Sequence, residues 1–360
     1  MSLKDKLLKN SRSKMTTTLD KSQLFNEKSV SRTKIPILNL ALSGSFSGGL
    51  QSGLTVLAGP SKHFKSNLGL TLVSAYLREH EDAVCLFYDS EFGITEDYMR
   101  SMGVDPSRVV HTPIKHLEEL KTDMMHQLDN IERGDKVIIF IDSLGNTGSM
   151  KEAEDAIKGE SKVDFTRAKE MKSLWRIATP HFTLKDIPCV AINHTIETIE
   201  LFSKTVMTGG TGIAYAADNV IIIGRRQIKE GTEIAGYQFV LNAEKSRMVK
   251  EKSKMFLTVT FDGGIDRFSG LLDIGLELGF VVKPKNGWYQ RALLNEETGE
   301  LLPDEECKLY REVQTRSMEF WKPLFLHKPF IDAVELRYKV AKIVSSDEVD
   351  EEVESIMNMI

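Results

Sequence analysis

Leu54-Thr-Val-Leu-Ala-Gly-Pro-Ser-Lys-His-Phe-Lys-Ser66 is the segment around which the rest of the chain is organised. Its first five residues are an apolar run long enough for a buried strand, and the run ends at Gly59. A helical pattern of apolar residues then follows Ser66: Leu68, Leu70, Leu72, Val73, Tyr76 and Leu77. A strand, a tight loop and a helix form a phosphate cradle, because loop N–H groups and the positive end of the helix dipole face the anion. We therefore expect Lys65 to reach the terminal phosphates of a nucleotide and Ser66 to bind Mg²⁺.

The loop departs from the usual pattern G-x-x-x-x-G-K-[ST] at one position, because Phe64 stands where the second Gly belongs. An ordinary strand-turn-helix connection with an exposed Lys has the same short signature, so the surrounding sequence has to decide between the two. If the loop binds a nucleotide, the positions expected to contact it are Gly59, Pro60, Ser61, Lys62, His63, Phe64, Lys65, Ser66 and Asn67.

Three more apolar runs, at residues 83–88, 137–141 and 188–192, predict further buried strands. Helical patterns lie between them, and the clearest covers residues 117–131. Strands that are apolar throughout and alternate with helices predict an α/β fold with a largely parallel sheet covered on both faces. Runs at 220–223 and 237–242 look like additional strands.

Polar side chains follow each of these strands: Glu91 after the second, Asp142 after the third and His194 after the fourth. In an open α/β sheet this edge is where ligands bind, so we expect these residues to share a crevice with the phosphate loop. There Asp142 would serve Mg²⁺, and Glu91 would orient or deprotonate an attacking water. Simpler roles stay open, because an acid after a strand is often a helix cap or a turn residue, and His194 could be a hydrogen-bonded core imidazole.

Two segments downstream have the composition of nucleic-acid contacts. Residues 147–164 are polar and weakly patterned, which predicts a mobile loop, and the helix after them carries a row of cations, Lys169, Lys172 and Arg176. Residues 195–213 combine an aromatic ring, a cation and flexible backbone, which suits a grip on a phosphodiester backbone. A solvated helix face and a plain Gly-rich loop are the alternatives. The candidate DNA-contacting residues are Lys169, Arg176, Phe202, Lys204, Thr208, Gly209, Gly210 and Thr211.

Two cations beyond the last predicted strand, Lys245 and Arg247, could act as charge clamps on a nucleotide, in the same subunit or in the next one. An exposed hairpin that happens to carry cations is the alternative.

Composition limits the remaining possibilities. The chain has 360 residues and a net charge of −5, so DNA binding has to come from a local patch. No apolar run approaches membrane-spanning length, and Cys85 and Cys189 lie in apolar runs, as buried thiols of a reducing cytoplasm do. The patterning predicts an N-terminal arm at 1–34, a core at 35–285 and a small helix-rich domain with an acidic end at 286–360.

Taken together, the motifs resemble the RecA family of recombinases, and most closely those of T-even-type phages. The likeness runs nearly end to end, and Phe64 matches the phage variant of the loop. It is carried by Arg32-Thr-Lys-Ile-Pro36, Ala58-Gly-Pro-Ser-Lys-His-Phe-Lys-Ser66, Phe87-Tyr-Asp-Ser-Glu-Phe-Gly93, Phe140-Ile-Asp-Ser-Leu-Gly145, Ala191-Ile-Asn-His194 and Thr208-Gly-Gly-Thr211.

The resemblance implies a RecA-like P-loop ATPase core that uses ATP and Mg²⁺ to form a helical filament on single-stranded DNA. The filament would pair this strand with a homologous duplex and exchange strands. Glu91, Lys65 and His194 would be catalytic, and Tyr98 would stack on adenine. Lys245 and Arg247 would cap ATP across the subunit interface.

Further expectations also come from the resemblance. The DNA loops would be about 147–168 and 195–213, and the arm at 1–34 would pack on the adjacent protomer. A phage single-strand DNA-binding protein and a loading mediator would be partners in the cytoplasm of the infected bacterium. Two alternative functions stay open. One is a ring helicase of the same fold, and the other is a non-catalytic filament protein in which bound nucleotide only stabilises the assembly.

Overall fold

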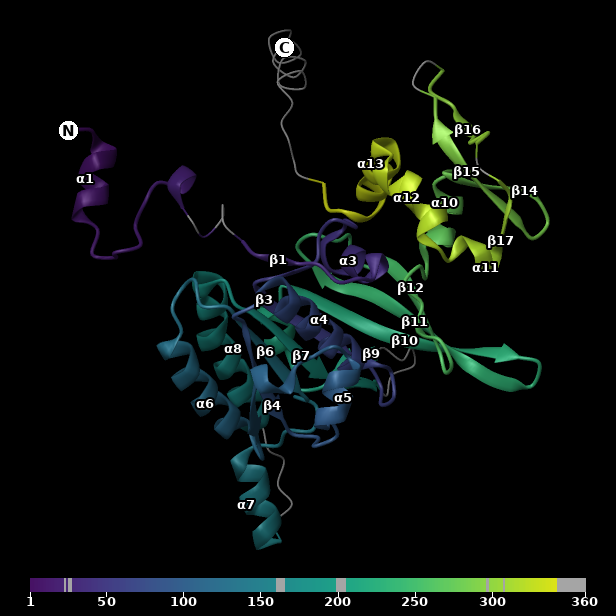
Figure 1. Ribbon diagram of the computed structural model, residues 1–360. Helices are drawn as coiled ribbons and strands as arrows, with labels where there is room; N and C mark the ends of the chain where they lie inside the picture. Colours follow the sequence, from purple (N-terminus) through teal and green to yellow (C-terminus); the bar gives the residue numbers. More distant parts are fainter. Residues whose placement is uncertain are drawn as a thin grey trace, which may run out of the picture.

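A central sheet organises the molecule (Figure 1). The computed structural model describes residues 1–22, 24, 28–159, 166–198, 205–295, 298–306 and 308–341. The sheet has nine strands in the order β13-β12-β11-β10-β3-β7-β6-β4-β5. In chain order these are β3 (Gly53–Ala58), β4 (Val84–Asp89), β5 (Val109–Pro113), β6 (Val137–Asp142), β7 (Pro188–Asn193), β10 (Asn219–Glu230), β11 (Glu233–Ser246), β12 (Lys254–Thr260) and β13 (Gly264–Ile265).

Strands β10, β3, β7, β6, β4 and β5 pair in parallel, whereas β11, β12 and β13 extend the sheet with antiparallel pairs. The predicted parallel core is therefore confirmed. The antiparallel extension begins with a long hairpin formed by Asn219–Glu230 and Glu233–Ser246. These two strands are much longer than the two short runs that the sequence predicted.

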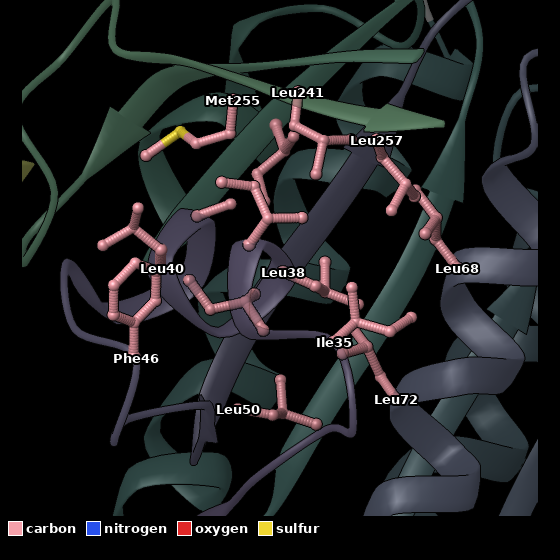
Figure 2. Close-up of a cluster of buried hydrophobic side chains, with 14 of the residues drawn as sticks. Ile35, Leu38, Leu40, Phe46, Leu50, Leu68, Leu72, Leu241, Met255 and Leu257 are labelled. Atoms are coloured by element: carbon pink, nitrogen blue, oxygen red, sulfur yellow. The ribbon is translucent and has the colours of Figure 1, made fainter. Parts of the chain in front are cut away.

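Helices cover both faces of the sheet. On one face lie α3 (Pro36–Ser43) and α4 (Lys65–Glu79), with α5 (Glu96–Ser101) and the 3₁₀ turn η2 (Pro106–Arg108) beside them; on the other lie α6 (Leu117–Asn130) and α8 (Thr166–Lys185). Neighbouring residues of one strand serve opposite layers: Phe87 is buried in the first hydrophobic cluster and Leu86 in the second. Figure 2 shows the first cluster, where Leu38 and Leu40 of α3 meet Leu241 and Leu257 of the sheet.

The C-terminal region contains the predicted helices and, in addition, a small sheet. The helices are α10 (Leu271–Glu277), α11 (Glu312–Thr315), α12 (Met318–Leu326) and α13 (Lys328–Tyr338), and the antiparallel strands are β14 (Val281–Lys285), β15 (Trp288–Leu294), β16 (Leu301–Pro303) and β17 (Tyr310–Arg311). These strands are short and interrupted by polar turns, so their sequence carries little periodicity. Trp321 and Phe330 join the hydrophobic cluster of the core, which ties this region to the main sheet.

The arm contains the short helix α1 (Leu3–Asn10), the 3₁₀ turn η1 (Leu19–Lys21) and β1 (Val30–Ser31), which pairs with β2 (Leu50–Gln51). Leu3 and Leu7 of α1 are exposed. Within the described residues no helix has both the length and the apolar character needed to cross a bilayer.

The expectation of a mobile loop at 147–164 was wrong in its central part, since α7 (Met150–Lys158) is helical. Ser149 caps this helix by accepting a hydrogen bond from the N–H of Glu152, and a Ser three residues before a Glu is a sequence signal for a helix start. The second predicted DNA loop begins with two short paired strands, β8 (Thr195–Glu197) and β9 (Thr205–Met207), and ends in α9 (Thr211–Ala216).

Candidate functional site

The phosphate loop connects β3 to α4, as the sequence predicts, and Lys65 is the first residue of the helix. Phe64 precedes it with φ 61° and ψ 18°, a left-handed conformation that normally favours Gly. The Phe64 ring stacks on Phe239 of β11 with 5.0 Å between ring centroids. This contact offsets the backbone strain and explains how a large residue can occupy the position of the usual Gly.

Gly59, at the start of the loop, is required by close packing. A Cβ atom at this position would lie 2.8 Å from the carbonyl oxygen of Ile223 in β10. The loop therefore leaves β3 in direct contact with the neighbouring strand.

Lys65 is buried, and its Nζ donates a hydrogen bond to the carbonyl oxygen of Pro60 at 2.8 Å. Burial lowers the pKa of Lys65, while the negative charges of Glu91 and Asp142 act in the opposite direction. The ammonium group is thus held inside the loop, close to two acids that come from other strands.

Asp142 ends β6 and is only 3% exposed. Burial raises the pKa of Asp142 to about 6, and a hydrogen bond from Ser66 opposes the rise. In the part of the chain that the structure describes, Oδ1 of Asp142 has no hydrogen-bond partner. A buried oxygen without a partner, next to a serine hydroxyl, fits a magnesium ion.

A magnesium ion here would take most of its ligands from outside the protein. The described residues contain no group of three or more His, Cys, Asp or Glu side chains that could hold a metal. Mg²⁺ commonly binds through one or two protein oxygens and completes its shell with water and phosphate oxygens. The pair of Ser66 and Asp142 suits that mode of binding.

Glu91 follows β4, and two side chains contact the same oxygen of its carboxylate. Ser143 Oγ donates to Glu91 Oε1 at 2.5 Å, and His194 Nε2 lies 3.1 Å from that oxygen. The bond to His194 is the main reason that the pKa of Glu91 lies below its ordinary value. The His194 ring fits only because residue 145 is Gly, since a Cβ there would lie 2.0 Å from His194 Cδ2.

Asp89 is a site residue to which the sequence analysis assigned no role. It is 2% exposed, and its Oδ1 accepts hydrogen bonds from the N–H groups of Glu91 (3.0 Å) and Phe92 (2.8 Å). Its Oδ2 lies 3.2 Å from His111 Nε2. Asp89 therefore fixes the turn that carries Glu91. The signal was present in the sequence, because Asp89 directly follows the apolar run at 83–88, as Asp142 follows the run at 137–141.

Asn193, the last residue of β7, joins the sheet edge to the second predicted DNA loop. It is fully buried, and its Nδ2 donates to the carbonyl oxygen of Thr208 at 3.0 Å, while Thr208 Oγ1 donates to Asn193 Oδ1 at 2.9 Å. The N–H of Thr208 also donates to the carbonyl oxygen of His194 at 3.0 Å. His194 thus touches Glu91 through its ring and Thr208 through its backbone.

The segment after Thr208 packs on α8. A Cβ on Gly212 would lie 3.0 Å from Lys172 Cα, and one on Gly210 would lie 3.7 Å from the Ala168 side chain. Lys169 and Arg176 of α8 are exposed, and Thr211 is exposed at the first turn of α9. The predicted DNA-contacting residues Phe202 and Lys204 lie outside the described residues.

Arg167, near the start of α8, holds the turn after β6. It donates hydrogen bonds to the carbonyl oxygens of Leu144 and Thr147, each at 2.8 Å. Helix α8 therefore contacts both the turn that enters the first predicted DNA loop and the Gly-rich end of the second.

Tyr98, the residue expected to stack on adenine, is half-buried in a cavity of about 880 Å³. Phe64, Asn67 and Met102 also line this cavity, so it opens directly from the phosphate loop. Burial raises the pKa of Tyr98, and a hydrogen bond to Asn67 acts in the opposite direction. The cavity is large enough for a nucleotide base and ribose.

Lys245 and Arg247 are not brought to the phosphate loop of their own chain. They lie near the opposite end of β3, because Asp218 bonds to both Leu54 and Arg247, and Lys245 bonds to Ala217, the residue before Asp218. A contact of either cation with nucleotide would have to be made to another copy of the chain.

Comparison with known proteins gives relatives along nearly the whole sequence. A family model described as "Bacteriophage T4, Recombination and repair protein, C-terminal domain" matches residues 268–334. The recombination and repair protein of Enterobacteria phage T4 is 62% identical over 356 residues, which cover 99% of this chain and 90% of that protein.

More distant relatives are bacterial. Protein RecA of Chloroherpeton thalassium is 28% identical over 253 residues, which cover 67% of each chain. Protein RecA of Paenarthrobacter aurescens is 28% identical over 265 residues, which cover 71% of this chain and 73% of that protein.

Proposed function

Since this chain belongs to the family of the phage T4 recombination and repair protein, a phage branch of the RecA-type recombinases, we propose that it is a DNA-dependent ATPase. It forms a helical filament on single-stranded DNA and exchanges that strand with a homologous duplex. Membership in the family accounts for a role in phage recombination and repair. Hydrolysis, the filament and strand exchange are the further steps of the proposal.

The observation that carries the proposal is a continuous set of contacts from the phosphate loop to the second DNA loop. Lys65 lies near Glu91 and Asp142, Glu91 contacts His194, and His194 bonds to Thr208. Four different strands contribute to this one edge of the sheet, where α/β proteins bind nucleotides.

In the proposed reaction Lys65 binds the terminal phosphates, and Glu91 accepts a proton from the attacking water. The lowered pKa of Glu91 keeps it ionised at neutral pH, as a base must be. Ser143 and His194 hold one oxygen of that carboxylate, which leaves the other oxygen for the water. Ser66 and Asp142 would hold Mg²⁺, which when bound neutralises charge on the phosphates during transfer.

The proposed DNA-binding surface lies on α8, where Lys169 and Arg176 are exposed on the helix that packs against residues 209–212. Their charges would bind the phosphodiester backbone. Thr208, Gly209, Gly210 and Thr211 would supply hydroxyl and backbone N–H groups. Because Thr208 bonds to both Asn193 and His194, a change in the contacts of His194 reaches this segment directly.

The proposed filament assembles through contacts between adjacent subunits. Lys245 and Arg247 contact ATP bound to the adjacent subunit, and residues 1–34 pack on that subunit. A phage single-strand DNA-binding protein and a loading mediator are the proposed partners, in the cytoplasm of the infected bacterium.

The test is the rate of ATP hydrolysis with and without single-stranded DNA. We expect hydrolysis to rise severalfold or more when DNA is added, because the DNA loop and the base Glu91 are joined through His194. Equal rates in the two conditions would contradict the proposal. Strand exchange between a circular single strand and a linear homologue then separates a recombinase from a DNA-dependent ATPase of another kind.

A further inference from the structure

A column of aromatic rings connects the phosphate loop to the long β10–β11 hairpin. The Phe64 ring stacks on Phe239 at 5.0 Å, and Phe239 lies 6.1 Å from Tyr237, two residues away on the same face of β11. Phe239 is buried and the other two rings are half-buried. The loop residue that replaces the usual Gly is thus the first member of a packed column.

Arg225 of β10 joins the far end of this column back to the loop. Its guanidinium lies over the Tyr237 ring, 4.5 Å from the centroid, and its Nη1 donates to the carbonyl oxygen of Lys62 at 2.9 Å. Two residues before Arg225, the carbonyl of Ile223 packs against Gly59. The hairpin therefore contacts the phosphate loop near its start, at its middle and at its end.

These contacts matter because the loop backbone is strained. Lys62 and Phe64 both have φ 61°, in the left-handed region that costs free energy for any residue with a Cβ atom. A loop with Gly at such positions adopts this shape without outside help. In this chain the shape has to be held by neighbouring groups, and Arg225 and Phe239 are the groups that touch Lys62 and Phe64.

We propose that Arg225 is a positioning residue for the phosphate loop, acting through the Lys62 carbonyl and through the ring column of Tyr237, Phe239 and Phe64. The hairpin sets the loop in its phosphate-binding shape. Because coupling between two sites is reciprocal, a nucleotide on the loop also steadies the hairpin around Arg225. The inference rests on the proposed nucleotide site and adds a part that lies outside it.

The chain offers a matched control in Arg226, the next residue of β10. It carries the same charge, is exposed like Arg225, and lies over a different ring, Phe256, at 5.9 Å. It faces away from the ring column, because alternate residues of a strand point to opposite sides of the sheet. A general effect of removing a cation from the hairpin would appear in both Arg225→Gln and Arg226→Gln.

The experiment measures binding of a fluorescent ADP analogue to the full chain without DNA, so that DNA affinity does not enter. We expect Arg225→Gln to weaken binding roughly tenfold, which is the scale of one charge-assisted hydrogen bond plus one cation–π contact. Phe64→Leu should weaken binding on a similar scale, because the ring that stacks on Phe239 is lost. In the double variant Arg225→Gln with Phe64→Leu the two effects should overlap and not multiply.

A second readout reports the hairpin itself. In the wild type, amide hydrogens of β10 and β11 near Arg225 should exchange more slowly when the ADP analogue is bound, and in Arg225→Gln this protection should disappear. An affinity of Arg225→Gln within about twofold of wild type, or an equal loss in Arg226→Gln, would overturn the proposal. Failure of the nucleotide site would look different, because Lys65→Ala would then bind and hydrolyse ATP like the wild type.

Discussion

The charged groups at the two ends of strand β3 differ in how fully the protein itself satisfies their hydrogen bonds. At the Leu54 end, Lys245 Nζ donates to three carbonyl oxygens, those of Ala214 (2.9 Å), Tyr215 (3.0 Å) and Ala217 (2.7 Å). Asp218 there accepts from the N–H of Leu54 and pairs with Arg247. At the Ala58 end, Lys65 donates to the carbonyl of Pro60, and Asp142 keeps a buried oxygen without a partner among the described residues.

The difference separates groups that hold the fold from groups that are set to bind something else. An ammonium group has three protons, and Lys245 uses all three on the end of α9, so it stabilises the chain as it stands. A buried carboxylate oxygen without a partner costs free energy that only a ligand can recover. Loss of Lys65 should therefore affect activity more than stability, and loss of Lys245 should do the reverse.

The largest effect is expected for Lys65→Ala. Turnover should fall by about 10² or more, because the cation that stabilises the phosphates in the transition state is lost. Stability should change little, since Lys65 gives up one hydrogen bond and a buried charge is removed at the same time. ATP hydrolysis and a thermal unfolding curve measure the two quantities. Full activity in this variant would show that Lys65 does not bind the phosphates of ATP.

Asp142→Asn should raise the stability of the chain while it abolishes hydrolysis. The pKa of Asp142 is about 6 in the folded chain and about 3.9 in an unfolded one, so between these values the folded state binds the proton more tightly. The ionised carboxylate consequently destabilises the folded state. This destabilisation is fully present above about pH 6 and absent below about pH 4.

The variant should therefore unfold at higher urea concentration than the wild type at pH 7.5 without Mg²⁺, by about 2–3 kcal/mol of unfolding free energy. This advantage should shrink as the pH falls toward 4, while Mg²⁺-dependent hydrolysis is lost at every pH. A variant less stable than the wild type at pH 7.5 would show that the carboxylate is paired after all.

Much of this arrangement could be predicted from the sequence, because each part has a local signature. Four apolar runs predicted the parallel strands, and the polar residue after each run predicted the edge at which Lys65, Glu91, Asp142 and His194 meet. These predictions rest on strand direction alone, and strand direction follows from the alternation of strands and helices.

Other parts depend on contacts between residues far apart in the chain, and no local pattern reports them. The stacking of Phe64 on Phe239 and the hydrogen bond from Arg225 to Lys62 join segments about 160 or more residues apart. Lys245 illustrates the same limit. Its sequence context fits a clamp on a nucleotide, and only the fold shows that it holds the end of α9.

The smallest effects are expected at the Leu54 end, where Lys245 and Arg247 form a matched pair of cations two residues apart. Lys245→Ala should lower the free energy of unfolding by about 1–3 kcal/mol, because three carbonyl oxygens at the end of α9 lose a charged donor. Arg247→Ala should change it by less than about 0.5 kcal/mol, since its side chain is 76% exposed and its ion pair with Asp218 is screened by water.

Urea unfolding of the two variants at equal protein concentration measures this difference. If both cations also contact ATP in an adjacent subunit, DNA-dependent hydrolysis by Arg247→Ala should fall at concentrations where filaments form, although its stability is unchanged. That combination makes Arg247 the cleaner probe of the subunit interface, because in Lys245→Ala a loss of hydrolysis would be mixed with damage to α9. Equal stability losses in the two variants would show that the Leu54 end does not depend on the bonds of Lys245.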